Sequence, residues 1–372
     1  MSEVPEVHVS DVMQFFNCRR AWGWQSRLRR NLEPMRPHRP FVLGSAFHAG
    51  VESYYKDRSP NRVDIAMAAA SKIFGQAAED LITSGGVMDD ELSQLIAGDT
   101  ELCTLMLMNY MQWAESADKD WEVIDTEREF QFPVWLDGDQ WSLDSVVRTT
   151  DPTFILAGRI DGVSIHKPTG TLWLREYKTA RSIPEEETKI AKSLQHRLYA
   201  WAAQQMVGKP VAGVEYRFAR KASPQFPRKL NSGKPSVALT GDGEYVTTGT
   251  FRTAYEVYTG KQLIDANGAV LTEYAEHYNA LLKREAEGQF FKVITVQRTS
   301  TELTTAVDTI ASVAQEMLNE STLLYPMPDV LGWNCNNCLF RAPCDRMDAG
   351  KDAEFLLKHE YRTRLPRHVE AV

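Results

Sequence analysis

Hydrophobic residues recur at helical spacing through residues 1–120. Phe47 and Val51, for example, stand four positions apart and are followed by further aromatic residues at a similar spacing, which places them on one face of a helix. The pattern predicts a mainly helical region, in which Ser10 caps the first helix and Cys18 lies on it. The expected helices span about residues 10–24, 41–55, 62–82 and 89–116.

The pattern changes near Trp121, where β-branched and aromatic residues replace the helical repeat. Segments such as TFILAGRIDGVSIH and TLWLREYKT are typical of strands, and the KPTG between these two predicts a hairpin turn. Helices and strands then alternate, which predicts an α/β core. The other expected elements are a strand at WEVIDTEREFQFPVW, a helix at about 187–207, a strand at GVEYRFAR, a helix at about 252–287 broken near Asn267, a strand at FFKVITVQRT and a helix at about 300–319.

The length of the chain allows one large domain or two medium ones, but no clear linker divides it, so we expect one integrated domain. With 372 residues, of which 43% are hydrophobic, the chain is long enough to bury a substantial core. No run of about 18 uncharged apolar residues and no secretion signal is present, so we expect a cytoplasmic protein without a membrane span. Its expected regions are a helical N-terminal segment at 1–120, a core at 121–320 with an irregular insertion at about 223–250, and a cysteine-rich tail at 321–372.

The formal charge of −8 argues against a protein that coats nucleic acid by overall charge, but basic residues gather in two stretches. Each stretch is either a solvated face or a phosphate-binding surface. The first has a single acidic residue, Glu33, among the arginines Arg19, Arg20, Arg27, Arg29, Arg30, Arg36 and Arg39. The second contains Arg217, Arg220, Lys221, Arg228, Lys229 and Lys234.

The five cysteines are unevenly distributed, at Cys18, Cys103, Cys335, Cys338 and Cys344. An odd number in a chain without a secretion signal argues against a disulfide framework and favours metal or cluster ligation. Spacing alone does not distinguish tetrahedral zinc from an iron-sulfur cluster. Cys103 lies among apolar residues at helical spacing, so we expect it in the core.

The segment LWLREYKT carries a charged pair on a strand that is otherwise buried. Glu176 and Lys178 stand two positions apart, so both side chains leave the same face. The KPTG hairpin brings Asp161 of AGRIDGV next to them. Two carboxylates and an ammonium group suit phosphodiester hydrolysis assisted by Mg²⁺ or Mn²⁺, with a salt-bridged strand end as the alternative.

Two further segments suit the same chemistry. His48 in GSAFH lies on a predicted helix, and imidazole is an acceptable ligand for Mn²⁺ or Mg²⁺. Gln195 and Tyr199 lie one helical turn apart, where both can contact a phosphate or a metal-bound water. The alternatives are a half-buried histidine and a packing tyrosine. The remaining candidates show no partner spacing and are given no role: His166, His196 and His277.

In this order, the four motifs resemble the RecB-like branch of the PD-(D/E)XK nucleases, which includes CRISPR-associated RecB-like exonucleases and phage relatives. The resemblance implies a restriction-endonuclease-like core, a mixed β-sheet flanked by helices. Many relatives have aspartate where this chain has Glu176, a change that the family pattern allows. The motifs are Gly44-x3-His48, Gly158-x2-Asp161, Glu176-x-Lys178 and Gln195-x3-Tyr199.

The resemblance also assigns roles to the residues. It implies that Mg²⁺ or Mn²⁺ is bound by His48, Asp161, Glu176 and the backbone carbonyl of Tyr177. It implies that Lys178 is catalytic and that the glutamine and tyrosine contact the substrate. The implied catalytic set is Asp161, Glu176, Lys178, Gln195 and Tyr199.

The cysteine pattern strengthens the resemblance. Cys335-x2-Cys338-x5-Cys344, with Cys18 as a distant fourth, is similar to the iron-sulfur members of the family. This likeness implies a 4Fe-4S cluster that joins the two chain ends, with Zn²⁺ as the alternative. Arg19 stands where related sequences often have proline.

The resemblance implies a metal-dependent exonuclease acting on single-stranded DNA or duplex ends, in recombination, repair or CRISPR-related processing, in a bacterial or phage-infected cell. The alternatives are a non-catalytic DNA-binding or scaffolding subunit with a structural four-cysteine site, and a zinc-stabilised enzyme of unrelated chemistry. Cleavage polarity, homo-oligomerisation and partner proteins from recombination or CRISPR systems stay open. The expected DNA-guiding surface beside the cluster consists of Arg19, Arg20, Arg27, Arg29 and Arg30.

Overall fold

A mixed β-sheet forms the centre of the protein. The computed structural model describes residues 4–137, 140–142, 151–183, 188–319, 321–326 and 333–364. Within these residues the strand order is β4-β3-β5-β6-β7-β8, and β1 pairs with β5 off this path. The β1–β5 and β6–β7 pairs are parallel and the others antiparallel. The strands are β1 (Glu6–His8), β3 (Trp121–Asp137), β4 (Gln140–Ser142), β5 (Phe154–His166), β6 (Thr171–Ala180), β7 (Val211–Arg220) and β8 (Phe291–Gln297).

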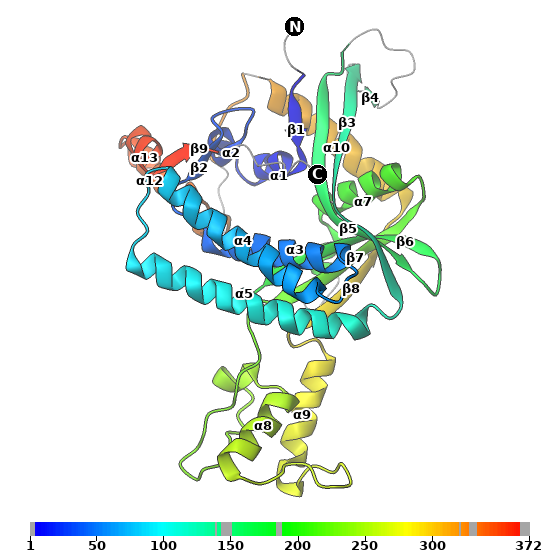
Figure 1. The fold of residues 1–372 in the computed structure, drawn as a ribbon. Coiled ribbons are helices and arrows are strands. Elements are labelled where there is room, and N and C mark those ends of the chain that lie inside the picture. Colours follow the sequence, from blue (N-terminus) through cyan, green and yellow to red (C-terminus); the bar gives the residue numbers. More distant parts are fainter. Residues whose placement is uncertain are drawn as a thin grey trace.

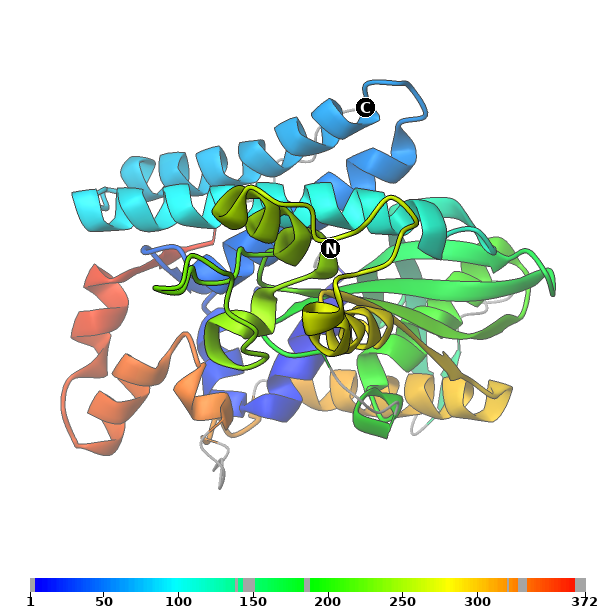
Figure 2. The same ribbon diagram turned by 90° about the horizontal axis from the view of Figure 1, so that it is seen from below.

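Helices cover both faces of this sheet, so the predicted α/β class is confirmed. Figure 2 shows the sheet between a layer containing α4 and α5 on one side and α10 on the other. One face shares its hydrophobic core with α1 (Val9–Asn17), α7 (Leu194–Val207) and α10 (Ser300–Leu318). The other face packs against α3 (Arg39–Lys56), α5 (Asp90–Ala117) and, through α3, α4 (Arg62–Thr83).

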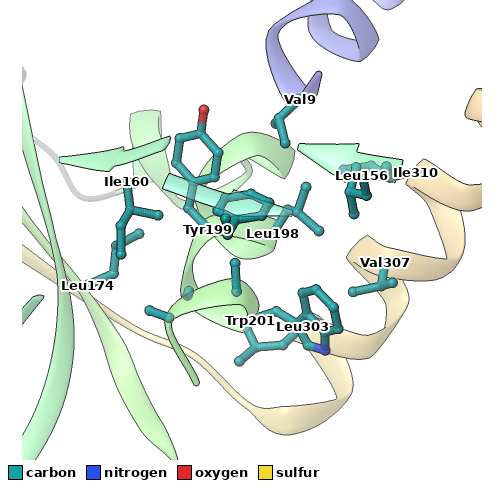
Figure 3. Close-up of a cluster of buried hydrophobic side chains, with 14 of the residues drawn as sticks. Val9, Leu156, Ile160, Leu174, Leu198, Tyr199, Trp201, Leu303, Val307 and Ile310 are labelled. Atoms are coloured by element: carbon teal, nitrogen blue, oxygen red, sulfur yellow. The ribbon is translucent and has the colours of Figure 1, made fainter. Parts of the chain in front are cut away.

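The first of these cores fixes α7 against the sheet. Leu198 and Trp201 of α7 lie beside Leu303 and Val307 of α10 (Figure 3). On each helix these residues are three or four positions apart, so they form one apolar stripe. The helix α7 lies on the crossover between the parallel strands β6 and β7, a connection that parallel pairing requires. Its first turn is therefore held next to β6.

The two ends of the chain lie side by side. β2 (Leu32–Pro34) pairs antiparallel with β9 (Tyr361–Thr363), and Figure 1 shows the C-terminal helices next to α2. A small hydrophobic cluster joins the ends, with Trp24 from the N-terminal segment and Phe340 from the C-terminal one. The helices here are α2 (Arg19–Gln25), α11 (Trp333–Asn336), α12 (Arg341–Asp348) and α13 (Ala353–His359).

The helix predicted at residues 10–24 is wrong as a single element. The chain forms α1 and α2 with Cys18 between them in an extended conformation, φ −167° and ψ 114°, and the N-cap is His8 rather than Ser10. After the break, α2 contributes to both cores: Trp22 packs with Phe15 of α1 in the sheet core, and Trp24 packs into the cluster at the chain ends. A continuous helical repeat does not reveal this change of direction at Cys18.

The segment between β7 and β8 forms a small unit with its own hydrophobic core, built around Phe251, Tyr274 and Leu281. Figure 1 shows it projecting from the sheet and its helices. Its elements are η1 (Gly241–Tyr245), α8 (Thr248–Thr259), η2 (Thr272–Tyr274) and α9 (Ala275–Ala286). The segment predicted as irregular, 223–250, contains the short helix η1 and the start of α8. The helix predicted at 252–287 is two helices, α8 and α9, with Asn267 in the loop between them.

The other predicted elements agree with the structure to within a few residues. The predicted KPTG hairpin joins β5 and β6, with Gly170 at φ +67°. The helix predicted at 187–207 is interrupted at Ser193, which caps α7 after the short α6 (Thr188–Ala191); residue 187 lies outside the described residues. None of the helices in the described ranges is both long and apolar enough to cross a bilayer.

Candidate active site

The site lies where the sheet forks. β5 pairs with β1 through residues 155–157 and with β6 through residues 162–166. Beyond the Gly162–Arg175 pair, β6 leaves β5 and continues beside β7. Asp161 lies in the gap, and its Oδ2 accepts a hydrogen bond of 2.9 Å from the backbone N–H of Tyr177. The carboxylate thus replaces the missing strand partner and is fixed at the fork.

Packing explains why a glycine, Gly158, stands three residues before Asp161. A Cβ atom on Gly158 would lie 2.6 Å from the Cζ atom of Phe130 and 3.2 Å from a methyl group of Val9. Real Cβ atoms do not approach a ring so closely. The absent side chain lets β5 pass under the Phe130 ring and places Asp161 three residues later at the fork.

Glu176 is held by two partners on one oxygen. Its side chain is 2% exposed, and Oε1 accepts from Lys178 Nζ and from His196 Nε2, the latter at 3.1 Å. Burial opposes ionisation, but Lys178 and His196 outweigh it and hold the pKa of this carboxyl below its usual range. Oε2 is buried and has no hydrogen-bond partner among the described residues. A buried, ionised oxygen without a partner is suited to a cation.

The neighbouring carboxyl titrates differently. Burial and the negative charge of Glu176 raise the pKa of Asp161 to about 7, against the opposing effect of His48 and Lys178. Burial alone would lower the pKa of Lys178, but Glu176 and Asp161 raise it, so the ammonium stays charged. A divalent cation that bound here would displace the proton of Asp161 and neutralise the charge of both carboxylates.

A third carboxylate joins the site from β3. His48 of α3 lies with Nδ1 3.6 Å from Asp161 Oδ2 and 3.7 Å from Glu127 Oε1. One potential ligand atom from each of these three residues lies within 4.8 Å of the others. Carboxylate oxygens and an imidazole nitrogen fit Mg²⁺ or Mn²⁺. Glu127 was not predicted from the sequence, because nothing in WEVIDTEREFQ distinguishes it from the other acidic residues of this strand.

The first turn of α7 brings three residues to the site. Gln195 Nε2 donates to the hydroxyl oxygen of Tyr199 at 3.2 Å, and Figure 3 shows this hydroxyl pointing away from the apolar cluster. Burial and the charges of Glu176 and Asp161 raise the pKa of Tyr199 to about 12, so the hydroxyl stays protonated. His196, which was given no role from the sequence, lies between Glu176 and Tyr216.

Most of the expected ligand set is thus brought together. His48, Asp161, Glu176 and Lys178 meet at the fork. For Tyr177 the structure gives a contact of the backbone N–H, and its side chain packs on the opposite face with α3 and α5. A role for its carbonyl oxygen stays a prediction.

The four cysteines of the predicted cluster line one cavity of about 220 Å³, together with Trp24 and Phe340. Arg20 Nη1 donates to Cys344 Sγ at 3.2 Å, and the Phe340 N–H donates to Cys338 Sγ at 3.4 Å. No three of the sulfur atoms lie within 4.8 Å of one another in the described residues. Four thiolates around one cavity suit either tetrahedral zinc or an iron-sulfur cluster. The cysteine that was expected in the core, Cys103, is buried there.

Most of the arginines expected to guide DNA make contacts within the protein, two of them to the C-terminal helices and two to the end of α10. Arg19 pairs with Glu316, Arg20 with Asp348 at 2.6 Å, and Arg30 with Glu354 at 2.6 Å. Arg29 donates to the carbonyl oxygens of Met317 and Asn319 at 3.1 and 2.9 Å. Arg27 is exposed. These contacts give the arginines structural roles, and a role in DNA binding stays a prediction.

The second basic stretch is not one continuous surface. Arg217 is fully buried and pairs with Glu215 at 2.7 Å and Asp118 at 2.6 Å. Arg175, equally buried, pairs with the same two acids. An alternating strand sends every second residue inward, so a run of charges in the sequence need not share one face.

The comparison with known proteins agrees with this geometry. No curated protein matches the chain. The family model of the PD-(D/E)XK nuclease superfamily matches residues 7–345, a range that contains the fork and all four cysteines of the cavity. The chain therefore belongs to the PD-(D/E)XK nuclease superfamily.

Proposed function

We propose that this protein is a metal-dependent DNA exonuclease that hydrolyses phosphodiester bonds in single-stranded DNA or at duplex ends. The observation that carries the proposal is the fork in the sheet. There Asp161 and Glu176 lie beside His48 and Lys178, and Glu176 Oε2 is buried without a partner among the described residues. Exonuclease action, in recombination, repair or CRISPR-related processing, is supported by the likeness of the four motifs to the RecB-like branch.

The charge of each residue suggests its role in the reaction. Asp161, Glu176 and His48 would hold Mg²⁺ or Mn²⁺, which supplies Lewis acidity toward the phosphate and lowers the pKa of a bound water. Lys178, anchored to Glu176 Oε1, keeps its positive charge and stabilises the negative charge that develops on the phosphate oxygens. Tyr199, protonated and hydrogen-bonded to Gln195, would donate a hydrogen bond to the same phosphate.

A 4Fe-4S cluster is the second element of the proposal. Its support is the single cavity that the four cysteines share and the likeness of their spacing to the iron-sulfur members of the family, with zinc as the alternative. The cluster would join α2 to the C-terminal helices, where ion pairs from Arg20 and Arg30 already connect them. Its contribution is therefore structural, beside the nuclease core.

The test uses anaerobically purified protein with end-labelled single-stranded and double-stranded DNA. With Mn²⁺, we expect products that shorten progressively from an end, and no products with EDTA. Glu176→Ala and Lys178→Ala should abolish cleavage. Lys167→Ala, which removes the same charge from the exposed hairpin turn, should cleave normally. DNA binding without cleavage in the wild-type protein would contradict the proposal and favour a non-catalytic subunit.

A further inference from the structure

Glu127 and Asp161 face each other across two antiparallel strands. They lie between the pairs Thr126–Gly162 and Arg128–Ile160. Directly opposed residues of an antiparallel pair project from the same face, and like charges there repel each other. The Glu127 side chain is nevertheless only 8% exposed. A cation bound between the two carboxylates would relieve this repulsion.

The backbone of β3 is distorted at this residue. Glu127 has φ +50°, the left-handed region, within a long strand. Residues other than glycine seldom adopt it, and such conformations persist where the surroundings impose them. The distortion thus coincides with the residue whose carboxylate lies beside His48 and Asp161.

The two oxygens of Glu127 have different neighbours. Oε2 accepts from Arg159 Nε at 2.8 Å, whereas Oε1 lies 3.7 Å from His48 Nδ1. Arg159 is half-exposed and fixes the carboxylate from the solvent side. Oε1 is left on the inner side, next to His48 and Asp161.

We propose that Glu127 is a direct ligand of the divalent metal, through Oε1, together with His48 and Asp161. It adds a carboxylate from β3 to the ligands that the family motifs supply, and Arg159 acts as a positioning residue for it. The inference rests on the proposed metal-dependent function. It explains why a buried carboxylate, strained backbone and imidazole converge opposite Asp161.

The competing explanation is that Glu127 is only the ion-pair partner of Arg159. The two explanations differ in what Arg159 does. If Glu127 is a ligand, removal of Arg159 leaves its carboxylate available to the metal. If the ion pair is its purpose, removal of either partner disturbs the site equally.

The experiment measures Mn²⁺ binding to the full chain without DNA, from the electron paramagnetic resonance signal of free Mn²⁺. We expect Glu127→Gln to raise the Kd at least about tenfold and Arg159→Gln to change it by less than about threefold. The control is Glu129→Gln, which removes the same charge from an exposed position that pairs with Arg159 in the strand register. It should leave the Kd within about twofold of wild type.

The outcomes separate this inference from the proposed function. Asp161→Asn should also weaken Mn²⁺ binding. If it does so while Glu127→Gln does not, the ligand role of Glu127 is wrong and the proposed function stands. If neither variant alters binding, both are wrong. Equal losses in Glu127→Gln and Arg159→Gln would reduce Glu127 to an ion-pair partner. If Glu127→Gln does not fold, the test uses Glu127→Asp, which keeps the charge but moves the carboxylate away from the metal because its side chain is shorter. An unchanged Kd for Mn²⁺ in Glu127→Asp would overturn the proposal.

Discussion

His196 supports Glu176 from behind, through a chain of buried hydrogen bonds. Its Nε2 lies 3.1 Å from Glu176 Oε1, and its Nδ1 lies 2.9 Å from the hydroxyl oxygen of Tyr216. Because the ionised carboxylate only accepts, Nε2 carries the proton, and in the neutral ring Nδ1 accepts from Tyr216. Burial raises the pKa of the Tyr216 hydroxyl to about 12, against the opposing effect of Arg298, so the hydroxyl keeps its proton. These two hydrogen bonds of His196 fix both its tautomer and the orientation of the Glu176 carboxylate.

Removing this support should lower activity without removing any group that touches DNA. We expect His196→Ala to reduce kcat roughly tenfold to hundredfold with little change in the KM for DNA, and to weaken Mn²⁺ binding in parallel. His196→Gln, whose amide can donate to Glu176, should recover some of the loss. Tyr216→Phe should show a smaller loss in the same direction. Full activity in His196→Ala, measured at several Mn²⁺ concentrations, would rule out the positioning role.

The raised pKa of Asp161 predicts how the metal-free protein responds to pH. A carboxyl whose pKa is about 7 in the fold keeps a proton that the unfolded chain releases near pH 4, so this group removes stability as the pH rises between these values. Asp161→Asn should therefore melt about 2–4 °C above wild type in EDTA at pH 8, and at the same temperature near pH 4.

Two comparisons complete this test. Asp151→Asn, at an exposed acid outside the site, should show no such pH-dependent gain in Tm. Adding Mn²⁺ at pH 8 should raise the Tm of the wild type but not that of Asp161→Asn. A melting difference that is the same at pH 4 and pH 8 would mean that Asp161 is not the group that titrates.

Local patterns in the sequence were enough for the core of the site. The KPTG turn sets the β5–β6 register, which brings Asp161 and Glu176 to one end of a hairpin. Helical spacing places His48 on α3 and Tyr199 on α7. Both predictions need only one turn or one helix, and such short-range relations are what periodicity encodes.

The residues that escaped prediction depend on contacts between distant elements. Glu127 reaches His48 through a positive φ that no local residue signals, and His196 acquires its partners only when α7 lies between β6 and β7. After the break at Cys18, α2 packs both on the sheet core, through Trp22, and on the cluster at the chain ends, through Trp24. Arg217 seemed a surface charge but pairs internally with Glu215, since burial of a charge depends on its tertiary partners.

The shared cavity of the four cysteines predicts a chromophore. Cys18→Ser or Cys344→Ser should abolish the absorbance at about 400 nm that is expected of an iron-sulfur cluster. Each variant should also have a lower Tm, because the cluster would join the two chain ends. The control is Cys103→Ala. This thiol is buried in another core, and burial raises its pKa to about 12, so its loss should leave the colour unchanged. A colourless wild-type protein that contains one zinc ion and melts normally would overturn the cluster.

The arginines near Cys18 should separate into structural and DNA-binding residues. Arg20 contacts Cys344 and Asp348, so Arg20→Ala should lower the Tm by about 2–4 °C. Arg27 is exposed, so Arg27→Ala should leave the Tm unchanged. If Arg27 contacts a phosphate, its loss should weaken DNA binding at low salt and reduce the slope of log K against log salt by about one. Fluorescence anisotropy with labelled single-stranded DNA, in EDTA to prevent cleavage, measures both quantities. An unchanged slope in Arg27→Ala would move the DNA path away from the chain ends and toward the open side of the fork.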